Sequence, residues 1–327
     1  PNKWALPPVI IQPLSYLIIF ASGKDRASPD GELHTNFKLT SGGEYLGLTR
    51  DDGEEGFTVL SEYAATYPEQ EQDISYGLDP ESLEHGYLKA SSPGEANAET
   101  AAGFVGDTAF SVDRGFFEAA FDLEITSSTE EATIRYTTDG STPSATRGTV
   151  YSEPVRISGT TVLRAAAFKD DYFATNVDTH TYLFLDDVRT QYANGSAPAG
   201  WPSGNVNGQQ FNYGMDPDIT SQYSAQQMLD ALSSIPSVSL AIDQSELTGG
   251  SGIYTNPRNR GKFWERPASF EILDAGGIKD NVQSNCGIRV RGGYSRSTSN
   301  PKHAFRVFFR NEYGAGKLNY PLFEGEG

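Results

Sequence analysis

Almost every apolar run in this 327-residue sequence is short and is bounded by Gly, Asp, Asn or Ser. Tyr and Phe are abundant, and the 34 Gly and 18 Pro residues punctuate the chain too often for long helices. Short aromatic-rich segments between turn residues are typical of β-sandwiches. The sequence therefore predicts a mainly β protein.

One segment has the periodicity of a helix. Four apolar residues recur at the spacing of one helical face: Ala225, Met228, Leu229 and Leu232. Thr220 or Ser221 can cap the start of this helix, and Pro236 ends it. The alternating residues 238–242 then predict a strand.

Charge separates the chain into two parts. Residues 1–249 carry 13 basic against 36 acidic residues, whereas residues 250–327 carry 12 basic against 7 acidic ones. The acidic part repels nucleic acid and anionic lipid, so we expect neither nucleic-acid binding nor membrane insertion. The longest apolar run, residues 16–21, is too short to cross a bilayer. The basic end is either a site for anions or a solvated face of mixed charge.

The single cysteine, Cys286, excludes an internal disulfide, and we expect it to be a small buried residue rather than a nucleophile. The four histidines are scattered without H-x-x-x-H or H-x-H spacing. A zinc site is therefore not expected.

Residues 1–98 predict short strands at 15–21, 36–40, 45–48 and 57–63, and the loop 91–97 closes this module. The segments 4–7, 16–22, 34–39, 67–77 and 93–97 resemble the second half of the lamin-tail domain, an immunoglobulin-like sandwich of bacterial surface proteins. The opening strands of that family have no counterpart here. The resemblance implies a partial sandwich, with upstream residues in the natural protein.

Residues 104–186 predict a second sandwich. Its best signal is the β-branched strand from Ile134 that runs into Asp139 and Gly140 and is stopped by Pro143. The string Tyr136-Thr137-x-Asp139-Gly140-x-x-Pro143 resembles the C-terminal domain of chitobiases and β-hexosaminidases, a non-catalytic fibronectin-III-like sandwich. Asp139 is compatible with calcium or sugar binding, but turn chemistry alone also explains an Asp-Gly pair.

Residues 187–219 are polar and Gly-rich and predict a linker. The linker contains Trp201, Phe211 and Tyr213, so we expect it to pack along a domain surface.

Residues 220–327 carry the closest resemblance. The segments 237–240, 252–257, 264–271, 287–296, 301–306 and 313–323 occur in the order found in the N-terminal part of the CotH (spore-coat) kinase family, which are atypical protein kinases. The resemblance implies a truncated, β-rich first part of a kinase-like α+β domain. The full expected architecture is thus two tandem immunoglobulin- or fibronectin-like sandwiches, a linker, and this partial domain.

The same region has a pattern that favours phosphate binding. Side chains alternate along a strand, so Arg289 and Arg291 share one face of strand 287–291, and Lys302, Arg306 and Arg310 share one face of strand 302–310. The Gly-containing loop 292–300 between them could approach phosphates through its amides. The tentative nucleotide-binding set is Lys302, Arg291, Arg296, Arg289, Arg306, Gly292 and Gly293, with Lys302 contacting ATP phosphates. The alternative is a hairpin with a solvent-exposed basic face.

The CotH resemblance also sets a limit on activity. The family's catalytic aspartates, which act as base and metal ligands, lie beyond the position matching Phe323. We therefore expect no catalytic residue, no metal site and no cofactor for this chain alone, and ATP with Mg²⁺ for the complete protein.

Two functions follow. The first is a piece of a large exported modular protein whose complete CotH-like domain binds ATP and phosphorylates proteins. The second is a structural or adhesive surface protein with a non-catalytic CotH-like domain. A glycosidase is disfavoured, because the catalytic barrel of hexosaminidases has no counterpart here. Expected partners are other domains of the same protein and a protein substrate, polysaccharide or neighbouring surface subunits, at an extracellular or cell-surface location.

Overall fold

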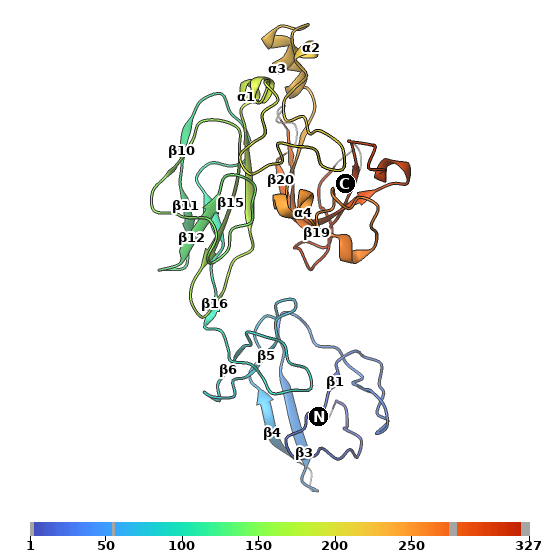
Figure 1. The fold of residues 1–327 in the computed structure, drawn as a ribbon. Coiled ribbons are helices and arrows are strands. Elements are labelled where there is room, and N and C mark those ends of the chain that lie inside the picture. Colours follow the sequence, from blue (N-terminus) through green and yellow to red (C-terminus); the bar gives the residue numbers. More distant parts are fainter. Residues whose placement is uncertain (1–2, 54–55, 275–279, 322–327) are drawn as a thin grey trace. The chain divides into compact units, whose positions relative to one another are not determined.

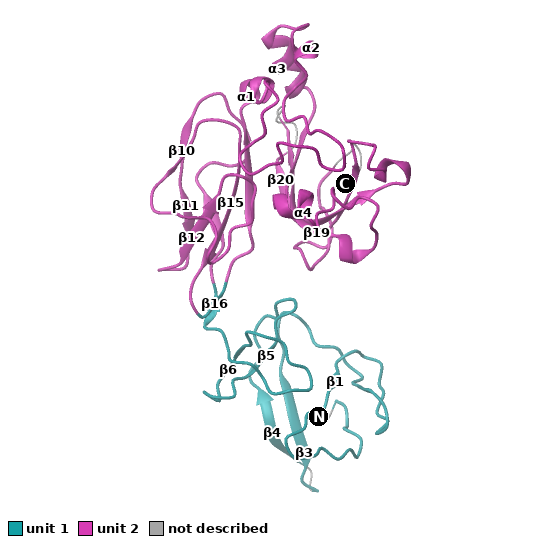
Figure 2. Cartoon of the chain, in the orientation of Figure 1, with its two compact units in different colours: residues 1–104, 171–173 teal, residues 105–170, 174–327 magenta. Residues whose placement is uncertain are grey.

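The computed structural model describes residues 3–53, 56–274 and 280–321. Most of its regular structure is β-strand (Figure 1), which confirms the mainly β prediction. The chain divides into two compact units, coloured in Figure 2: residues 1–104 with 171–173, and residues 105–170 with 174–327. We call them unit 1 and unit 2.

Unit 1 consists of short strands that pair two by two. The pairs are β1 (Ile19–Phe20) with β2 (Leu33–His34), β3 (Leu46–Asp51) with β4 (Phe57–Tyr63), β5 (Tyr76–Leu78) with β6 (His85–Tyr87), and β7 (Gly103–Phe104) with β16 (Tyr172–Phe173). The predicted strands 45–48 and 57–63 correspond to β3 and β4. Only two residues of the predicted strand 15–21 form one. The predicted strand 36–40 is wrong, because this segment contributes a single bridge, from Lys38 to Ser22.

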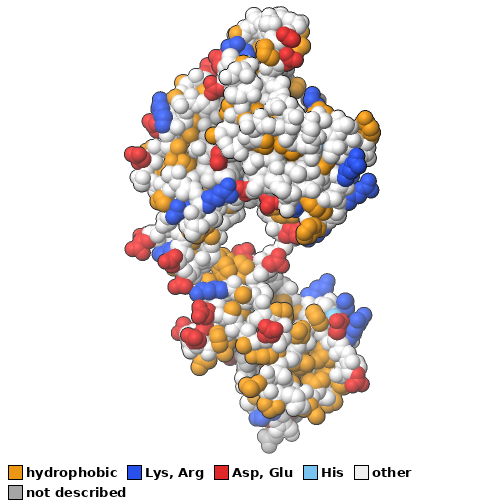
Figure 3. Space-filling view, viewed as in Figure 1, with side chains coloured by type: hydrophobic (Ala, Val, Ile, Leu, Met, Phe, Trp, Pro, Cys, Tyr) orange, Lys and Arg blue, Asp and Glu red, His pale blue; other side chains and the backbone are white. Residues whose placement is uncertain are grey.

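The interior of unit 1 is small and aromatic. Its buried apolar side chains are Leu33, Tyr67 and Leu88. Ring contacts with centroid distances between 4.8 and 5.2 Å run from Tyr76 through Tyr87 and Phe104 to Phe173. Many other apolar side chains lie on the surface of this unit (Figure 3). This aromatic series connects the pair β5-β6 with the pair β7-β16.

Unit 2 begins with a sandwich, here called the central sandwich (residues 105–170 and 174–184). One sheet has the order β13-β12-β15-β17-β9, and the pairs β10-β14 and β11-β8 complete the fold. The bounds are β8 (Thr108–Phe110), β9 (Gly115–Phe116), β10 (Phe121–Leu123), β11 (Ile125–Ser127), β12 (Thr133–Thr137), β13 (Thr149–Val150), β14 (Val155–Ile157), β15 (Thr161–Phe168) and β17 (Asp178–Leu183). Leu123, Ile125, Ile157 and Leu163 are buried to 1% exposure or less and fill its interior.

The Asp139-Gly140 pair forms the turn that the sequence indicates. Gly140 has φ +78°, a left-handed conformation that favours glycine, and the Ser141 amide donates to Oδ1 of Asp139 at 3.0 Å. Asp139 therefore caps its own turn.

The predicted linker packs on the C-terminal part of unit 2. Its first residues, 187–190, belong to helix α1 (Leu185–Thr190), so the linker begins later than predicted. The Phe211 ring lies 4.7 Å from the ring of Tyr254. The amides of Asn207 and Gln209 donate to the carbonyls of Tyr254 and Thr298 at 2.7 and 3.2 Å. These contacts explain why a polar segment carries aromatic residues.

Helix α3 (Ala225–Ser233) is the predicted helix, but the predicted cap is wrong. Ser224 caps it in a capping box with Gln227, whereas residues 217–220 form a separate short helix, α2 (Pro217–Thr220), capped by Asp216. Pro217 starts α2 because proline is favoured at the first helical position. Of the predicted apolar face, Met228 is the buried member.

Unit 2 ends in a four-stranded antiparallel sheet, here called the C-terminal sheet. Its order is β18 (Ser237–Ala241), β19 (Arg266–Leu273), β20 (Val282–Arg291) and β21 (Ala304–Phe308). Helix α4 (Gln244–Thr248) and the 3₁₀ turns η1 (Lys262–Trp264) and η2 (Tyr294–Arg296) occupy its connections. Cys286 lies fully buried in its core with Ile242, Ile253, Ala268, Ile288 and Val290.

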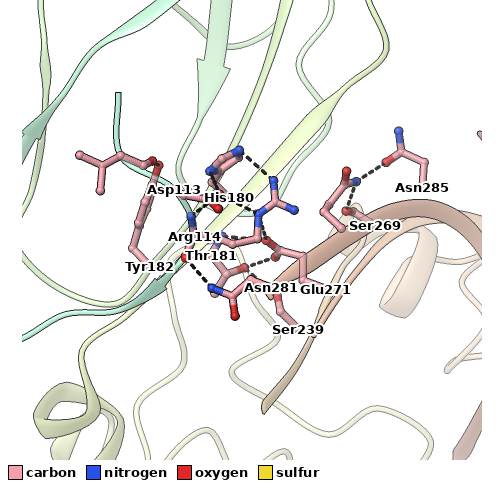
Figure 4. A network of polar contacts seen from close by, with 12 residues as sticks. Asp113, Arg114, His180, Thr181, Tyr182, Ser239, Ser269, Glu271, Asn281 and Asn285 are labelled. Carbon is pink, nitrogen blue, oxygen red and sulfur yellow. Dashed lines mark hydrogen bonds and ion pairs between the residues drawn. The ribbon is translucent and has the colours of Figure 1, made fainter. Parts of the chain in front are cut away.

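The central sandwich and the C-terminal sheet meet through buried polar groups (Figure 4). Glu271 of β19 has a fully buried side chain, and its carboxylate accepts from the amide of Thr181 at 3.1 Å and from the Thr181 hydroxyl. Nε of Arg114 lies 3.7 Å from Oε1 of Glu271. The pKa of Glu271 is raised, chiefly by burial. The junction is therefore specified by hydrogen-bond geometry.

The helices of the described segments include none with both the length and the apolar character needed to cross a bilayer.

Candidate functional site

Part of the predicted basic face is present on β20 and β21, whereas Lys302 and Arg310 lie outside these strands. Arg289 lies directly opposite Arg306 in the antiparallel register, and Arg291 lies opposite Ala304. Residues opposite each other in a sheet point to the same side, so the two guanidinium groups share a face. Arg289 is half-buried and Arg306 is exposed.

Phe308 organises this face. The guanidinium carbon of Arg289 lies 4.1 Å from the Phe308 ring centroid, and those of Arg310 and Arg306 lie at 4.8 and 6.0 Å. Each cation is attracted to the negative face of the ring. One aromatic side chain thus gathers three arginines, here called the arginine cluster (Arg289, Arg306 and Arg310).

A buried carboxylate neutralises part of the arginine cluster. Nε of Arg310 donates to Oε1 of Glu265 at 2.8 Å, and Nε of Arg289 lies 3.3 Å from Oε2. The Glu265 side chain has 0% exposure, so these charges interact with little screening by water. Arg306 makes no ion pair within the described segments, and its charge faces solvent.

Gly287 makes room for that carboxylate. A Cβ at this position would lie 2.5 Å from the Tyr313 ring and 2.7 Å from Cγ of Glu265. The glycine in the Gly287-Ile288-Arg289 string is thus required by the close approach of Glu265 and Tyr313, a requirement that the sequence pattern does not reveal.

The guanidinium group of Arg296 holds the loop in place. Its Nη1 donates to the Asn259 carbonyl at 3.0 Å, and its Nη2 donates to the Val290 carbonyl at 2.6 Å. The pKa of Arg296 is lowered by burial and by the nearby positive charges of Arg260, Arg289 and Arg306. Arg296 therefore contributes to the positive potential but positions the loop rather than reaching into solvent.

Arg291 and Lys302 are exposed at the end of the hairpin. The predicted strand 302–310 is too long, because β21 begins at Ala304 and ends at Phe308. The Lys302 amide instead donates to the Asn300 side chain at 3.1 Å, and a turn from Arg310 to Tyr313 follows the strand. Lys302 consequently lies outside the sheet, and no described contact joins it to the arginine cluster.

The two loop glycines differ. Gly292 has φ +112°, and a Cβ there would collide with the Ser295 hydroxyl. At Gly293 a Cβ would enter open space. The amides of Arg296, Ser297 and Asn300 donate to carbonyls within the loop, so they are not directed at a ligand.

His303 fixes the return of the loop. Its Nδ1 lies 2.6 Å from the Ser295 carbonyl, a contact that requires the tautomer with the hydrogen on Nδ1. Its ring packs at a tilt against Tyr254, with 4.8 Å between the ring centroids. The linker residue Gln209 holds the same loop through the Thr298 carbonyl. The basic loop is therefore supported from two sides.

Sequence reasoning missed Glu265 and Phe308, which organise the cluster. The alternation along 302–310 already places Phe308 on the face of Arg306, so it could have been found from the spacing. Glu265 follows η1 and precedes β19, far from Arg289 and Arg310 in the sequence, and no local signal indicates it. The predicted segment 313–323 ends at residues 322 and 323, which lie outside the described residues.

The residues that the structure describes contain no group of three or more His, Cys, Asp or Glu side chains arranged to hold a metal ion. Burial raises the pKa of the Cys286 thiol to about 12, with a smaller effect from Glu265. Cys286 is therefore a core residue and not an activated nucleophile.

A family model described as the chitobiase/β-hexosaminidase C-terminal domain matches residues 112–179. The match lies within the segment 104–186 in which the sequence predicted this module, and it includes the Asp139-Gly140 turn. No curated protein and no solved structure matches the chain. The match covers a minority of the chain, and it supports a β-sandwich at this position.

Proposed function

We propose that the C-terminal sheet is a phosphate-binding module and that, within a longer exported protein with a complete CotH-like domain, it binds ATP for phosphorylation of a protein substrate. The observation that carries the proposal is the position of Arg306, whose charge is exposed beside the partly neutralised Arg289 and Arg310.

Charge supports phosphate as the ligand class. Glu265 offsets part of the charge of Arg289 and Arg310, and Arg260 and Arg296 add positive potential nearby. A surface with excess guanidinium groups attracts phosphoryl groups, which guanidinium binds in a bidentate manner. Lys302 and Arg291, exposed at the hairpin end, extend this potential.

The described residues do not fit Mg²⁺, because they offer no grouped carboxylates. Phosphoryl transfer would need such groups from elsewhere in a longer protein. For the chain itself we propose only ATP binding through the arginine cluster, whereas the sequence alone led us to expect no cofactor for it.

Calorimetric titration with ATP at low ionic strength tests the proposal. We expect Arg306→Ala to weaken binding by about tenfold, because a charge-assisted hydrogen bond contributes about 1.5 kcal/mol. Lys302→Ala is expected to weaken it as well. Lys24→Ala, an exposed lysine of unit 1, is the charge-matched control and should leave binding unchanged. No heat of binding at roughly 1 mM ATP would overturn the proposal.

We also propose a structural or adhesive role as the second candidate. It is supported by the buried contacts between Glu271, Thr181 and Arg114, which join the central sandwich to the C-terminal sheet. Analytical ultracentrifugation would test it: self-association favours this role, and a monomer that binds no polysaccharide on a glycan array counts against it.

A further inference from the structure

A cavity of about 420 Å³ lies in unit 2, away from the arginine cluster. It is lined by the turn between β14 and β15, by the end of α1 and by Thr138 after β12. Pockets that hold small ligands have volumes of roughly 300–1,000 Å³. This cavity is therefore large enough for a molecule of the size of a monosaccharide or disaccharide.

Most of the lining residues are polar, with Ile157 as an apolar member. The lining contributes five hydroxyl groups, one amide, one carboxylate and one guanidinium: Thr138, Ser158, Thr160, Thr161, Thr190, Gln191, Asp187 and Arg156. The carboxylate and the guanidinium carry opposite charges, so the site favours neither an anion nor a cation. Donors and acceptors are both present, as recognition of a neutral hydroxylated ligand requires.

Part of this lining is already used by the fold. The Thr160 hydroxyl donates to the Phe184 carbonyl at 3.1 Å, and the Thr161 hydroxyl donates to the Gly159 carbonyl at 2.8 Å. Thr190 donates to the Asp186 carbonyl at 2.9 Å. The hydrogens of these three hydroxyls are therefore already used in hydrogen bonds that hold the wall of the cavity.

Other groups of the lining keep their hydrogen-bonding capacity. Within the described part of the chain, the side chains of Thr138, Ser158 and Gln191 make no hydrogen bond. Oδ2 of Asp187 accepts from the Thr160 amide at 2.9 Å, which leaves Oδ1 for a ligand. The ion pair of Arg156 with Asp122, at 3.2 Å, is exposed on both sides and is easily exchanged for another partner.

Asp187 is held in place by the backbone opposite it. A Cβ at position 159 would lie 2.6 Å from Oδ2 of Asp187, so Gly159 is what allows the carboxylate to reach the Thr160 amide. The carboxylate is thus fixed before any ligand arrives. A fixed acceptor beside free hydroxyl and amide groups is suited to adjacent hydroxyls of a sugar ring.

From this arrangement we infer that the cavity is a binding site for a neutral sugar. Oδ1 of Asp187 accepts from a ligand hydroxyl, and Ser158, Thr138 and Gln191 complete the hydrogen bonds. The inference concerns a different site from the phosphate-binding module and stands or falls independently of it.

Saturation-transfer difference NMR with glucose, galactose and N-acetylglucosamine tests the inference. We expect at least one of them to bind with a dissociation constant on the order of 1 mM. Ser158→Trp fills the exposed mouth of the cavity and should abolish the signal. Ser152→Trp, an exposed serine of the same sandwich outside the lining, is the matched control and should retain it.

A second variant addresses the carboxylate itself. Asp187→Asn keeps the size of the side chain and its acceptor for the Thr160 amide, and it should weaken sugar binding by about tenfold. Thermal unfolding checks that both variants remain folded. No transfer to any of the three sugars, or transfer equally strong in Ser158→Trp, would overturn the inference. Binding of inorganic phosphate at this cavity instead of a sugar would also overturn it. ATP titration of Ser158→Trp should match that of the unmodified chain.

Discussion

The amide of Thr142 donates a hydrogen bond of 3.1 Å to Oδ1 of Asp243, and the Thr142 hydroxyl donates to Oδ2 of the same carboxylate. Arg147 adds a third donor, with Nη1 2.7 Å from Oδ1. Thr142 belongs to the Asp-Gly turn of the central sandwich, and Asp243 precedes α4 of the C-terminal part. The string that carries the chitobiase resemblance therefore serves here as a docking loop.

Asp243→Ala should lower the free energy of unfolding by about 2 kcal/mol, because it leaves the Thr142 and Arg147 donors without their acceptor. Urea denaturation measures this effect. Asp230→Ala removes an exposed carboxylate on α3 and should change the stability by less than about 0.5 kcal/mol. Equal effects of the two substitutions would mean that the docking contact contributes nothing.

Gly287→Ala should destabilise the chain by about 1–3 kcal/mol, since the new Cβ would collide with Tyr313 and Glu265 and displace the carboxylate from Arg289 and Arg310. Gly293→Ala is the matched control. Its Cβ enters open space, so its stability should stay within about 0.5 kcal/mol of the unmodified chain. Denaturant titration of both variants measures the two free energies of unfolding. An unchanged stability of Gly287→Ala would contradict the close approach of Tyr313 and Glu265 to this position.

We expect the stability of the fold to depend on pH through Asp178. Burial, the largest cause, raises its pKa from 3.8 to about 6, and Asp107 adds to the rise against the opposing effects of Thr108 and Arg114. The folded state therefore binds this proton more tightly than the unfolded state does. The associated stability is present below pH 3.8 and is lost as the pH rises through about 6.

Asp178→Asn cannot ionise, so its stability relative to the unmodified chain should increase by about 1–2 kcal/mol between pH 4 and pH 8, after allowance for solvent screening. Thermal melts at several pH values measure the difference. Asp170→Asn, an exposed neighbour, should show no such trend. A pH-independent difference for Asp178→Asn would refute the assignment.

Ser224→Ala should lower the free energy of unfolding by about 1 kcal/mol, because it removes the capping box with Gln227. Ser221→Ala, at a position that sequence reasoning offered as the cap, should have a smaller effect, since the Ser221 hydroxyl only donates to the Asp218 carbonyl at 3.3 Å. Circular dichroism during chemical denaturation compares them. A larger loss of stability in Ser221→Ala than in Ser224→Ala would indicate that Ser221 caps the helix, as the sequence had suggested.

The basic face was predictable because it depends on strand alternation alone. Arg289 and Arg306 carry their orientation in the spacing of their own strands, and any antiparallel pairing in this register brings them together. The sequence placed Arg296 in the loop. It did not predict that Arg296 holds the loop in place, because this role depends on hydrogen bonds to the carbonyls of Asn259 and Val290. Nucleotide binding by these residues stays a prediction.

Local chemistry in the sequence determined strands β3 and β4, the Asp139-Gly140 turn and the existence of helix α3, because each depends on neighbours within a few residues. Only the tertiary structure decided that Glu265 neutralises Arg289 and Arg310, that Asp243 receives Thr142, and that Gly159 makes room for Asp187. Each of these relationships joins residues that lie far apart in the chain. Their distance is set by the packing of whole sheets, which no local pattern encodes.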